Sequence, residues 1–174
     1  MSDLLHPRID FNSKKTRFFI YAGVALIISI LQILILDTIS IAGLTPDLLV
    51  ILCAVISIRE GQFIGLIAGF IIGLFFDIVS FDVIGTNALA KTFVGFFSGY
   101  FYKEGFHKTT FRSIKFIAIV FASSLVNNFI YYLIYIEPME LSFFRFFIKY
   151  GIAMAFYTTV FSIFVLFYNM RKKV

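Results

Sequence analysis

The sequence predicts an all-α, polytopic membrane protein with six transmembrane helices. Apolar residues make up 60% of the 174 residues, and the mean hydropathy is +0.96. A water-soluble domain of this size could not bury so large an apolar fraction, whereas a bilayer accommodates it on the protein surface. The apolar residues gather in six segments, and clusters of basic residues alternate with them along the chain. The segments set the fold class, and the clusters set the orientation.

The six predicted helices differ in length. The first, fifth and sixth are long enough to cross about 30 Å of hydrocarbon at about 1.5 Å per residue, and the third is adequate. The fourth is short, and the second gives only about 20 Å of helix unless it begins earlier, in the apolar stretch 39–45. The segments cover residues 18–36, 46–58, 61–79, 87–102, 114–136 and 143–168.

The basic residues predict that both ends of the chain lie in the cytoplasm. Twelve of the fifteen Lys and Arg residues fall on one side of a six-span arrangement, namely Arg8, Lys14, Lys15, Arg17, Arg59, Lys103, Lys108, Arg112, Lys115, Arg171, Lys172 and Lys173. Lys and Arg are enriched in cytoplasmic loops. The opposite side carries the acids Asp37, Asp47, Asp77, Asp82, Glu137 and Glu140. An odd number of spans would divide the basic clusters between both faces.

A single domain is expected. Residues 1–17 are interpreted as a cytoplasmic tail, 18–170 as one six-helix transmembrane domain, and 171–174 as a short basic cytoplasmic end. Ser40-Ile41-Ala42 resembles a signal-peptidase site. The first apolar segment, however, exceeds the roughly 7–15 residues of a signal peptide, so we expect it to be retained as a helix.

The third segment carries a glycine at every fourth position: Gly61, Gly65, Gly69 and Gly73. Residues four apart lie on one face of a helix. Small residues let helix backbones approach closely in lipid, where no hydrophobic force brings helices together. The glycine ladder therefore predicts close helix packing, either inside the chain or against a helix of a partner.

Polar residues within the apolar segments are candidates for a functional site or for contacts between helices. Asp77 continues the glycine spacing, and Lys91 is a base inside the fourth segment. Charged groups in a membrane are costly unless they are paired or hydrated, so we expect either an Asp77–Lys91 ion pair or a functional site. Asn127 and Asn128 lie inside the fifth segment. They are expected to hydrogen-bond between helices or to line a cavity.

Two segments begin with residues that favour helix starts on the predicted outer face. Such starts either are capped by the chain itself or form an anion site, since backbone N–H groups point out of a helix N-terminus. In the second segment, we expect Thr45 to be the cap, Pro46 the first helical residue and Asp47 part of the first turn. In the fourth segment, we expect a turn at Gly85 to be followed by a cap at Thr86 or Asn87 and a helix from Ala88.

The sequence contains no set of residues typical of catalysis. Its histidines, His6 and His107, fall in loops without carboxylate or cysteine partners at ligand spacing, which argues against a metal site. Cys53 is the single cysteine, and no phosphate-binding or dinucleotide-binding glycine motif is present. We therefore expect a protein that is not an enzyme, needs no cofactor and does not bind nucleic acid. Its basic residues are expected to meet membrane lipid.

The stretch from Thr45 to Tyr100 resembles the central part of the MreD family of bacterial rod shape-determining membrane proteins. The order of several short motifs carries this resemblance, which covers about a third of the chain. The motifs are Pro46-Asp47, Arg59, Gly69, Gly73-Leu74-Phe75-Phe76-Asp77 and Gly85-Thr86-Asn87-Ala88-Leu89. The high Phe and Tyr content departs from the Leu-rich composition of the family.

The resemblance implies a non-enzymatic scaffold in the inner membrane. Such a protein would bind MreC directly and, through it, MreB, RodA and a class B penicillin-binding transpeptidase, and so couple MreB filaments to peptidoglycan synthesis and rod shape. The resemblance also implies a fold similar to the substrate-binding subunits of energy-coupling-factor vitamin transporters. The alternative function is therefore a small-molecule uptake subunit, which would need an outward cavity with polar groups such as Asp77, Asn87, Lys91 and Asn127.

Overall fold

The computed structural model describes residues 14–35, 40, 44–104, 107–111, 113–135 and 143–171. The elements in these ranges are all helical. Parts of the predicted terminal segments and of the Ser40-Ile41-Ala42 site lie outside the described residues. So do several charged residues or side chains that support the predicted orientation: Arg8, Lys14, Asp37, Lys108, Arg112, Glu137, Glu140, Lys172 and Lys173.

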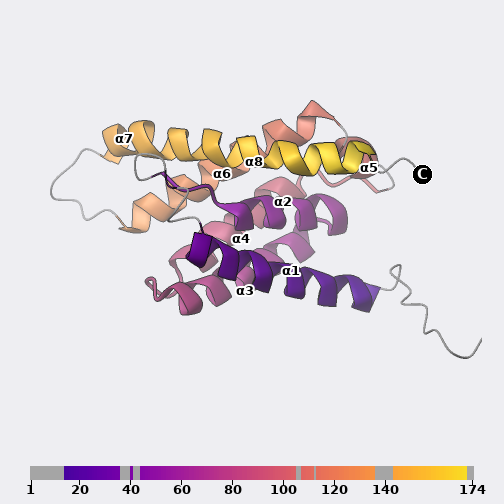
Figure 1. Ribbon diagram of the computed structural model, residues 1–174, viewed down its shortest axis with the longest axis horizontal. Coiled ribbons are helices and arrows are strands. Elements are labelled where there is room, and N and C mark those ends of the chain that lie inside the picture. Colours follow the sequence, from indigo (N-terminus) through magenta and orange to yellow (C-terminus); the bar gives the residue numbers. More distant parts are fainter. Residues whose placement is uncertain are drawn as a thin grey trace, which may run out of the picture.

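Each of the six predicted segments contains a helix, and the helix ends differ from the predicted ends by four residues or fewer. Figure 1 shows them lying lengthwise in one bundle, with successive segments running in opposite directions. They are α1 (Lys14–Ile35), α2 (Leu48–Glu60), α3 (Gln62–Ser80), α4 (Thr86–Gly99), α6 (Ile114–Tyr135) and a sixth segment. The sixth combines α7 (Phe143–Phe146), the π-helical turn η1 (Phe147–Gly151) and α8 (Ile152–Arg171), while the short helix α5 (His107–Phe111) precedes α6.

Four helical stretches are long and apolar enough to cross a membrane: Lys15–Leu34, Gln62–Ser80, Ile114–Ile134 and Phe144–Tyr168. The other two helices are shorter, since α2 has 13 residues and α4 has 14. Each therefore measures roughly 20 Å. The predicted shortness of the second and fourth segments is thus confirmed, and four of the six helices are long enough to span a membrane. An earlier start of the second helix is wrong, because α2 begins at Leu48.

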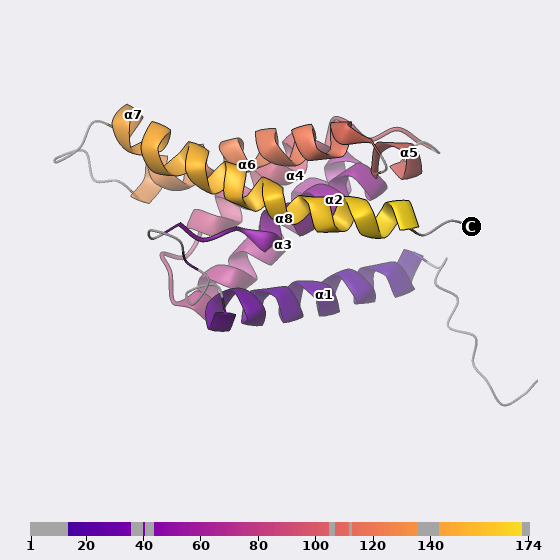
Figure 2. The same cartoon turned by 45° about the horizontal axis from the view of Figure 1, so that its top comes forward.

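The short helix α2 lies in the centre of the bundle. Its residues from Leu49 to Ile58 are buried, with Val55 half-buried. A helix that is apolar on all sides is a buried helix. One side of α2 packs with residues of α1, α3 and α4, and the other side packs with α5, α6 and α8. In Figure 2, α2 lies between the layer that contains α1 and the layer that contains α6 and α8.

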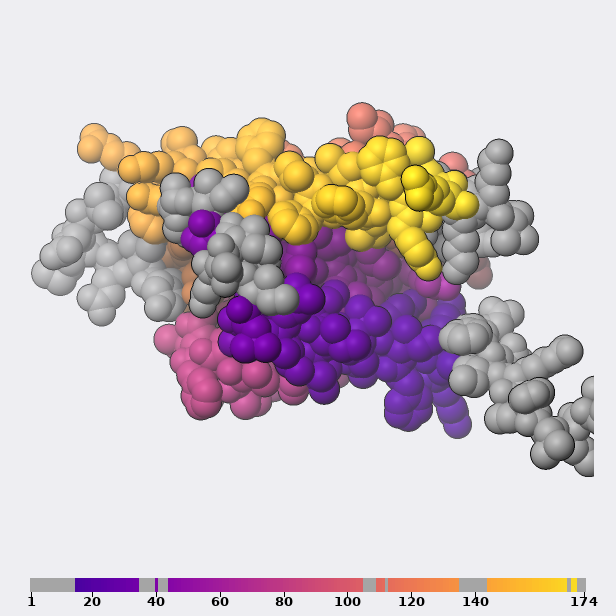
Figure 3. Space-filling view, viewed as in Figure 1, coloured from indigo at the N-terminus to yellow at the C-terminus, as the bar shows by residue number. Residues whose placement is uncertain are grey.

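Helix α1 is held to the centre by a polar contact near its start. The Arg17 guanidinium lies 3.3 Å from the Glu60 carboxylate, and the Tyr21 hydroxyl donates to the same carboxylate at 2.8 Å. Glu60 ends α2, so these bonds fix the start of α1 against the end of α2. Among the four long helices, α1 buries the smallest share of its residues. It lies on the surface of the molecule in the space-filling view (Figure 3).

The helix directions place most of the described basic residues at one end of the bundle, although Glu60 and Glu104 also lie there and Arg145 and Lys149 lie at the opposite end. The start of α1 and the end of α8 lie at the same end of the bundle (Figure 1). The end of α2 and the start of α6 lie at this end too. The basic residues Lys15, Arg17, Arg59, Lys115 and Arg171 belong to these helix ends. The acids Asp47, Asp77 and Asp82 belong to the opposite end, where α2 and α4 begin and α3 ends.

Candidate functional site

Helices α3 and α4 pack with their backbones in direct contact. A Cβ atom added to Gly69 would meet the backbone carbonyl of Lys91, and one added to Gly73 would meet the carbonyl of Asn87. Gly95 of α4 contributes from the other side, where a Cβ would meet the carbonyl of Gly65. We call this contact the α3–α4 seam, formed by Gly65, Gly69 and Gly73 of α3 with Gly95 of α4. Small residues at the contact allow helix backbones to approach this closely.

The seam corresponds to the first of the two kinds of packing that the glycine ladder predicts, packing inside the chain. Helix α4 of the same chain occupies the glycine face of α3. Gly61 lies outside the seam, between α2 and α3. Its φ of +100° is favourable for glycine alone, and it lets the chain reverse direction after α2.

Asp77 caps α4 from the end of α3. Its buried carboxylate accepts backbone N–H bonds from Gly85 at 2.9 Å, Asn87 at 3.1 Å and Ala88 at 3.1 Å. These N–H groups belong to the first turn of α4 and its N-cap, and have no partner within the helix. A negative charge at a helix N-terminus is also favoured by the helix dipole. Asp77 thus joins the two helices of the seam at their acidic end.

This arrangement corrects two predictions. Asp77 does not pair with Lys91; it bonds to backbone instead. Helix α4 begins at Thr86 after Gly85, whose φ of +103° makes the turn, so the cap is neither Thr86 nor Asn87. The Thr86 hydroxyl has no hydrogen-bond partner in the part of the chain that the structure describes.

Replacing Asp77 with alanine is expected to lower the free energy of unfolding by about 2–3 kcal/mol, because three N–H groups, two of them buried, would lose their acceptor. Asp77→Asn should cost less, since one side-chain oxygen remains. The measurement is the melting temperature of the protein purified in detergent. Ser80→Ala is the control, because the Ser80 hydroxyl donates only to the Phe76 carbonyl one turn back. An unchanged melting temperature for Asp77→Ala would rule out the capping role.

Lys91 pairs with Asp47, a residue that lies 44 positions earlier. Its ammonium lies 3.0 Å from Asp47 Oδ2 and 2.8 Å from Asn87 Oδ1. The Lys91 side chain is fully buried, whereas that of Asp47 is 18% exposed. The ammonium also lies 5.4 Å from the centre of the Phe76 ring, within cation–π range. A buried cation is thereby compensated by a carboxylate, an amide oxygen and an aromatic face.

Asp47 is also the N-cap of α2. Its Oδ1 accepts the backbone N–H of Val50 at 3.1 Å, and its own N–H donates to the Thr158 hydroxyl of α8 at 3.0 Å. The predicted cap, Thr45, is therefore wrong, and Pro46 precedes the cap. Asp47 thus caps α2 as Asp77 caps α4. Because a carboxylate of the chain occupies each helix start, neither start forms an open anion site.

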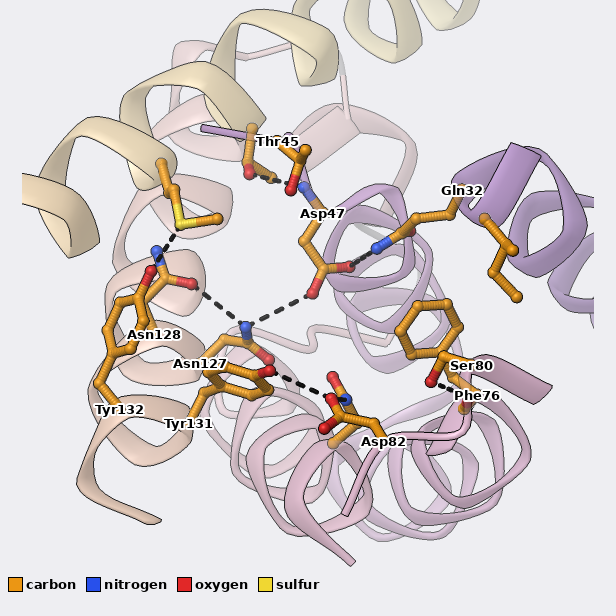
Figure 4. A pocket seen from close by; sticks show the side chains of 14 residues that line it. Gln32, Thr45, Asp47, Phe76, Ser80, Asp82, Asn127, Asn128, Tyr131 and Tyr132 are labelled. Carbon is orange, nitrogen blue, oxygen red and sulfur yellow. Dashed lines mark hydrogen bonds between the residues drawn. The ribbon is translucent and has the colours of Figure 1, made fainter. Parts of the chain in front are cut away.

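A cavity of about 320 Å³ lies at the acidic end of the bundle, where all six helical segments contribute (Figure 4). Most of the residues that line it carry a polar group. The lining residues are Gln32, Ile33, Thr45, Asp47, Phe76, Ser80, Asp82, Asn87, Asn127, Asn128, Tyr131, Tyr132, Met154 and Thr158. The size is at the lower limit of small-molecule sites, which are about 300–1,000 Å³. We call this space the polar cavity.

Hydrogen bonds connect the side chains around the polar cavity. Asn127 Nδ2 donates to Asp47 Oδ2 at 3.4 Å, and Asp82 Oδ2 accepts from the Tyr131 hydroxyl at 3.1 Å and from Asn87 Nδ2 at 3.2 Å (Figure 4). Two carboxylates therefore face the same space. The amide oxygens of Gln32 and Asn127 have no hydrogen-bond partner among the described residues. In this described part of the chain, the wall therefore presents two unpaired amide acceptors beside its two carboxylates.

The structure buries all four polar residues singled out from the sequence, Asp77, Lys91, Asn127 and Asn128. Three of them belong to one network, because Lys91 and Asn127 both contact Asp47 Oδ2 and Asn127 donates to Asn128. Asn127 and Asn128 line the polar cavity, whereas Asp77 and Lys91 lie outside its wall. Asn128 also donates to the Gly151 carbonyl at 2.8 Å, which ties α6 to the sixth segment. The two asparagines thus combine both predicted roles.

Sequence reasoning missed several residues of the polar cavity. The sequence identifies Asp82 only as a loop charge, and Tyr131, Gln32 and Thr158 are not among the predicted site residues. Asp82 and Tyr131 are 49 positions apart and meet only in the folded bundle. A polar residue inside an apolar segment was the available signal for Gln32 and Thr158. In the described part of the chain, no group of three or more His, Cys, Asp or Glu side chains is placed to hold a metal ion.

Comparison with known proteins gives one match. A family model described as rod shape-determining protein MreD matches residues 12–172. This range contains every helix of the bundle and every lining residue of the polar cavity. No curated protein and no solved structure matches the chain.

Proposed function

Because the chain belongs to the MreD family, we propose that it is a non-enzymatic membrane scaffold that binds MreC. Family membership itself implies a role in the determination of rod shape. Through MreC, the chain would contact MreB, RodA and a class B penicillin-binding transpeptidase, and so couple the filaments to peptidoglycan synthesis. The match over residues 12–172 carries this proposal, since it extends the resemblance of the central stretch to nearly the whole chain.

The proposed location is the inner membrane, with all six helical segments crossing it and both ends in the cytoplasm. The alternating directions of the six segments and the basic residues at one end of the bundle support this topology. Residues 18–170 would then form one transmembrane domain. The polar cavity would open toward the periplasmic side, and α2 and α4 would cross where neighbouring helices shield their short lengths.

The structure changes the mechanism expected for the scaffold. Since α4 fills the glycine face of α3, a partner would meet the outer surface of the bundle. The α3–α4 seam, the Asp77 cap and the Asp47–Lys91 pair would instead keep that surface in one shape. A rigid bundle of this kind can present the outer domain of MreC at a fixed height above the membrane.

Co-purification with tagged MreC from detergent tests the scaffold. We expect the wild-type chain and Gly23→Leu to be retained by MreC, because a Cβ at Gly23 would meet nothing within 4 Å. Gly73→Leu should be lost from the complex, because its side chain would collide with the α4 backbone. If the wild-type chain elutes as a single folded species and is not retained by MreC, the scaffold proposal is wrong.

The polar cavity favours a second candidate function, a small-molecule-binding subunit for uptake. Its amide acceptors and carboxylates would suit a small molecule with several hydrogen-bond donors. Neighbouring genes distinguish the two candidates: genes for MreB, MreC and a transpeptidase are expected for the scaffold, and genes for a pair of transport ATPases for the uptake subunit.

A further inference from the structure

A second hollow lies at the basic end of the bundle, away from the polar cavity. Its volume is about 620 Å³, and it is found where α4 ends, beside α5, and where α6 begins. Figure 1 shows α5 at the end of the molecule where α8 also ends. The lining residues are Tyr100, Phe101, Lys103, Thr109, Thr110, Ser113, Lys115, Ala118, Ile119 and Ala122. We call this hollow the basic-end groove.

The floor of the groove follows one face of α6. Lys115, Ala118, Ile119 and Ala122 are spaced by three and four positions, which is the spacing of one helix face. Lys115 and Ala122 are separated by about 10 Å along the helix axis. The alanine side chains are short, and they leave room next to the helix. The groove therefore has a charged end at Lys115 and an apolar channel that runs from this end along α6 to Ala122.

The rim of the groove is basic and rich in hydroxyl groups. Lys103 and Lys115 are both exposed, and neither has an ion-pair partner among the described residues. Thr109 and Ser113 add hydroxyl groups beside them, and Phe101 adds an aromatic wall. No acidic residue lines the groove in the described part of the chain. An occupant with a negative head is thus attracted to the rim, and no lining carboxylate repels it.

We propose that the basic-end groove binds one anionic phospholipid of the surrounding bilayer. The phosphate group would lie between Lys103 and Lys115, and an acyl chain would lie over Ala118 and Ala122. Basic pockets between membrane helices bind anionic lipid heads in this manner. The combination of a cationic rim and an apolar channel selects a lipid over a soluble phosphate, which would leave the channel empty. This inference does not depend on MreC binding.

Native mass spectrometry of the full chain tests the inference, with phosphatidylglycerol and phosphatidylcholine supplied together in the detergent micelles. We expect the wild-type chain to retain one phosphatidylglycerol in preference to phosphatidylcholine. Lys103→Gln/Lys115→Gln should lower this preference by about thirtyfold, since each lysine near an anionic head contributes about 1 kcal/mol and about 1.4 kcal/mol corresponds to a factor of ten. Ala122→Phe should reduce retention as well, because the ring would fill the channel while both charges remain.

Arg145→Gln/Lys149→Gln is the matched control, because it removes two exposed charges from the start of the sixth segment at the other end of the bundle. It should leave the preference unchanged. Equal retention of the two lipids by the wild-type chain would overturn the inference. So would an unchanged preference in Lys103→Gln/Lys115→Gln, or an equal loss in the control, since the charge alone would then attract the lipid. Retention of free inorganic phosphate in place of the lipid would overturn it too.

Discussion

Gly69→Leu is expected to prevent the chain from forming its native bundle. A Cβ at this position already meets the backbone carbonyl of Lys91, and the carbonyl carbon would lie only 2.8 Å away. Backbone cannot rotate out of the way as a side chain can, so α3 and α4 would have to separate. Overpacking in a tight core costs about 1–3 kcal/mol, and separating the seam adds the loss of its other contacts. Because the two helices meet backbone to backbone, no flexible side chain can move aside to make room for the leucine.

The measurement is the elution profile and melting temperature of the detergent-purified protein. Gly23→Leu makes the same change on α1 at a position where a Cβ meets nothing within 4 Å. It should match the wild-type chain or exceed it slightly, because leucine favours helix more than glycine does. If Gly69→Leu and Gly23→Leu show the same melting temperature, the seam is not a tight contact.

Breaking the Asp47–Lys91 pair is expected to have the next largest effect. Lys91→Met would leave the Asp47 carboxylate without its cation, and Asp47→Asn would leave a buried ammonium with the Asn87 oxygen as its remaining polar partner at hydrogen-bond distance. Removing one partner of a buried pair costs about 3–5 kcal/mol. The 18% exposure of Asp47 places the expected loss near the lower value. Asparagine can still accept from Val50, so the α2 cap is retained.

The double variant Asp47→Asn/Lys91→Met separates pairing from other effects. Replacing both members removes both uncompensated charges, so the double variant should be more stable than the sum of the single losses predicts. The measurement is a double-mutant cycle on thermal unfolding. Arg17→Gln is the control, because its ion pair with Glu60 is more exposed and should contribute about 1 kcal/mol or less. Strictly additive single losses would show that Asp47 and Lys91 do not stabilise each other.

The sequence predicts the helices of this protein well because their signal is local. Runs of apolar residues between charged ends locate α1, α3, α6 and α8 to within a few residues. The family could be recognised for the same reason, since the order of Pro46-Asp47, the glycine ladder and Asp77 lies within one continuous stretch. Glycine spacing also predicts that α3 packs closely, although it does not identify the neighbouring helix.

The hydrogen-bond and ion-pair partners of the buried charged side chains could not be predicted, because these contacts depend on how distant segments of the chain meet. Asp77 and Lys91 are close in sequence and opposite in charge, which favours a pair between them. In the bundle, Asp77 lies under the start of α4, where backbone N–H groups satisfy it first. Lys91 points instead toward the start of α2, where Asp47 has entered from a distant part of the chain. The wall of the polar cavity follows from the same long-range contacts.

The short helix α4 provides the most direct test of the six-span topology. Only α4 and its flanking turns separate Ile84, which is 72% exposed at the acidic end, from Glu104, which is exposed at the basic end. If α4 crosses the membrane, these two positions lie on opposite sides. If only the four long helices cross, both positions lie on one side.

The measurement is labelling of Ile84→Cys and Glu104→Cys, each made in a Cys53→Ala background, with a membrane-impermeant maleimide in right-side-out vesicles. The six-span topology predicts that Ile84→Cys reacts in intact vesicles and that Glu104→Cys reacts only after detergent opens them. Reaction of both cysteines in intact vesicles, of neither until detergent is added, or of Glu104→Cys alone would contradict it.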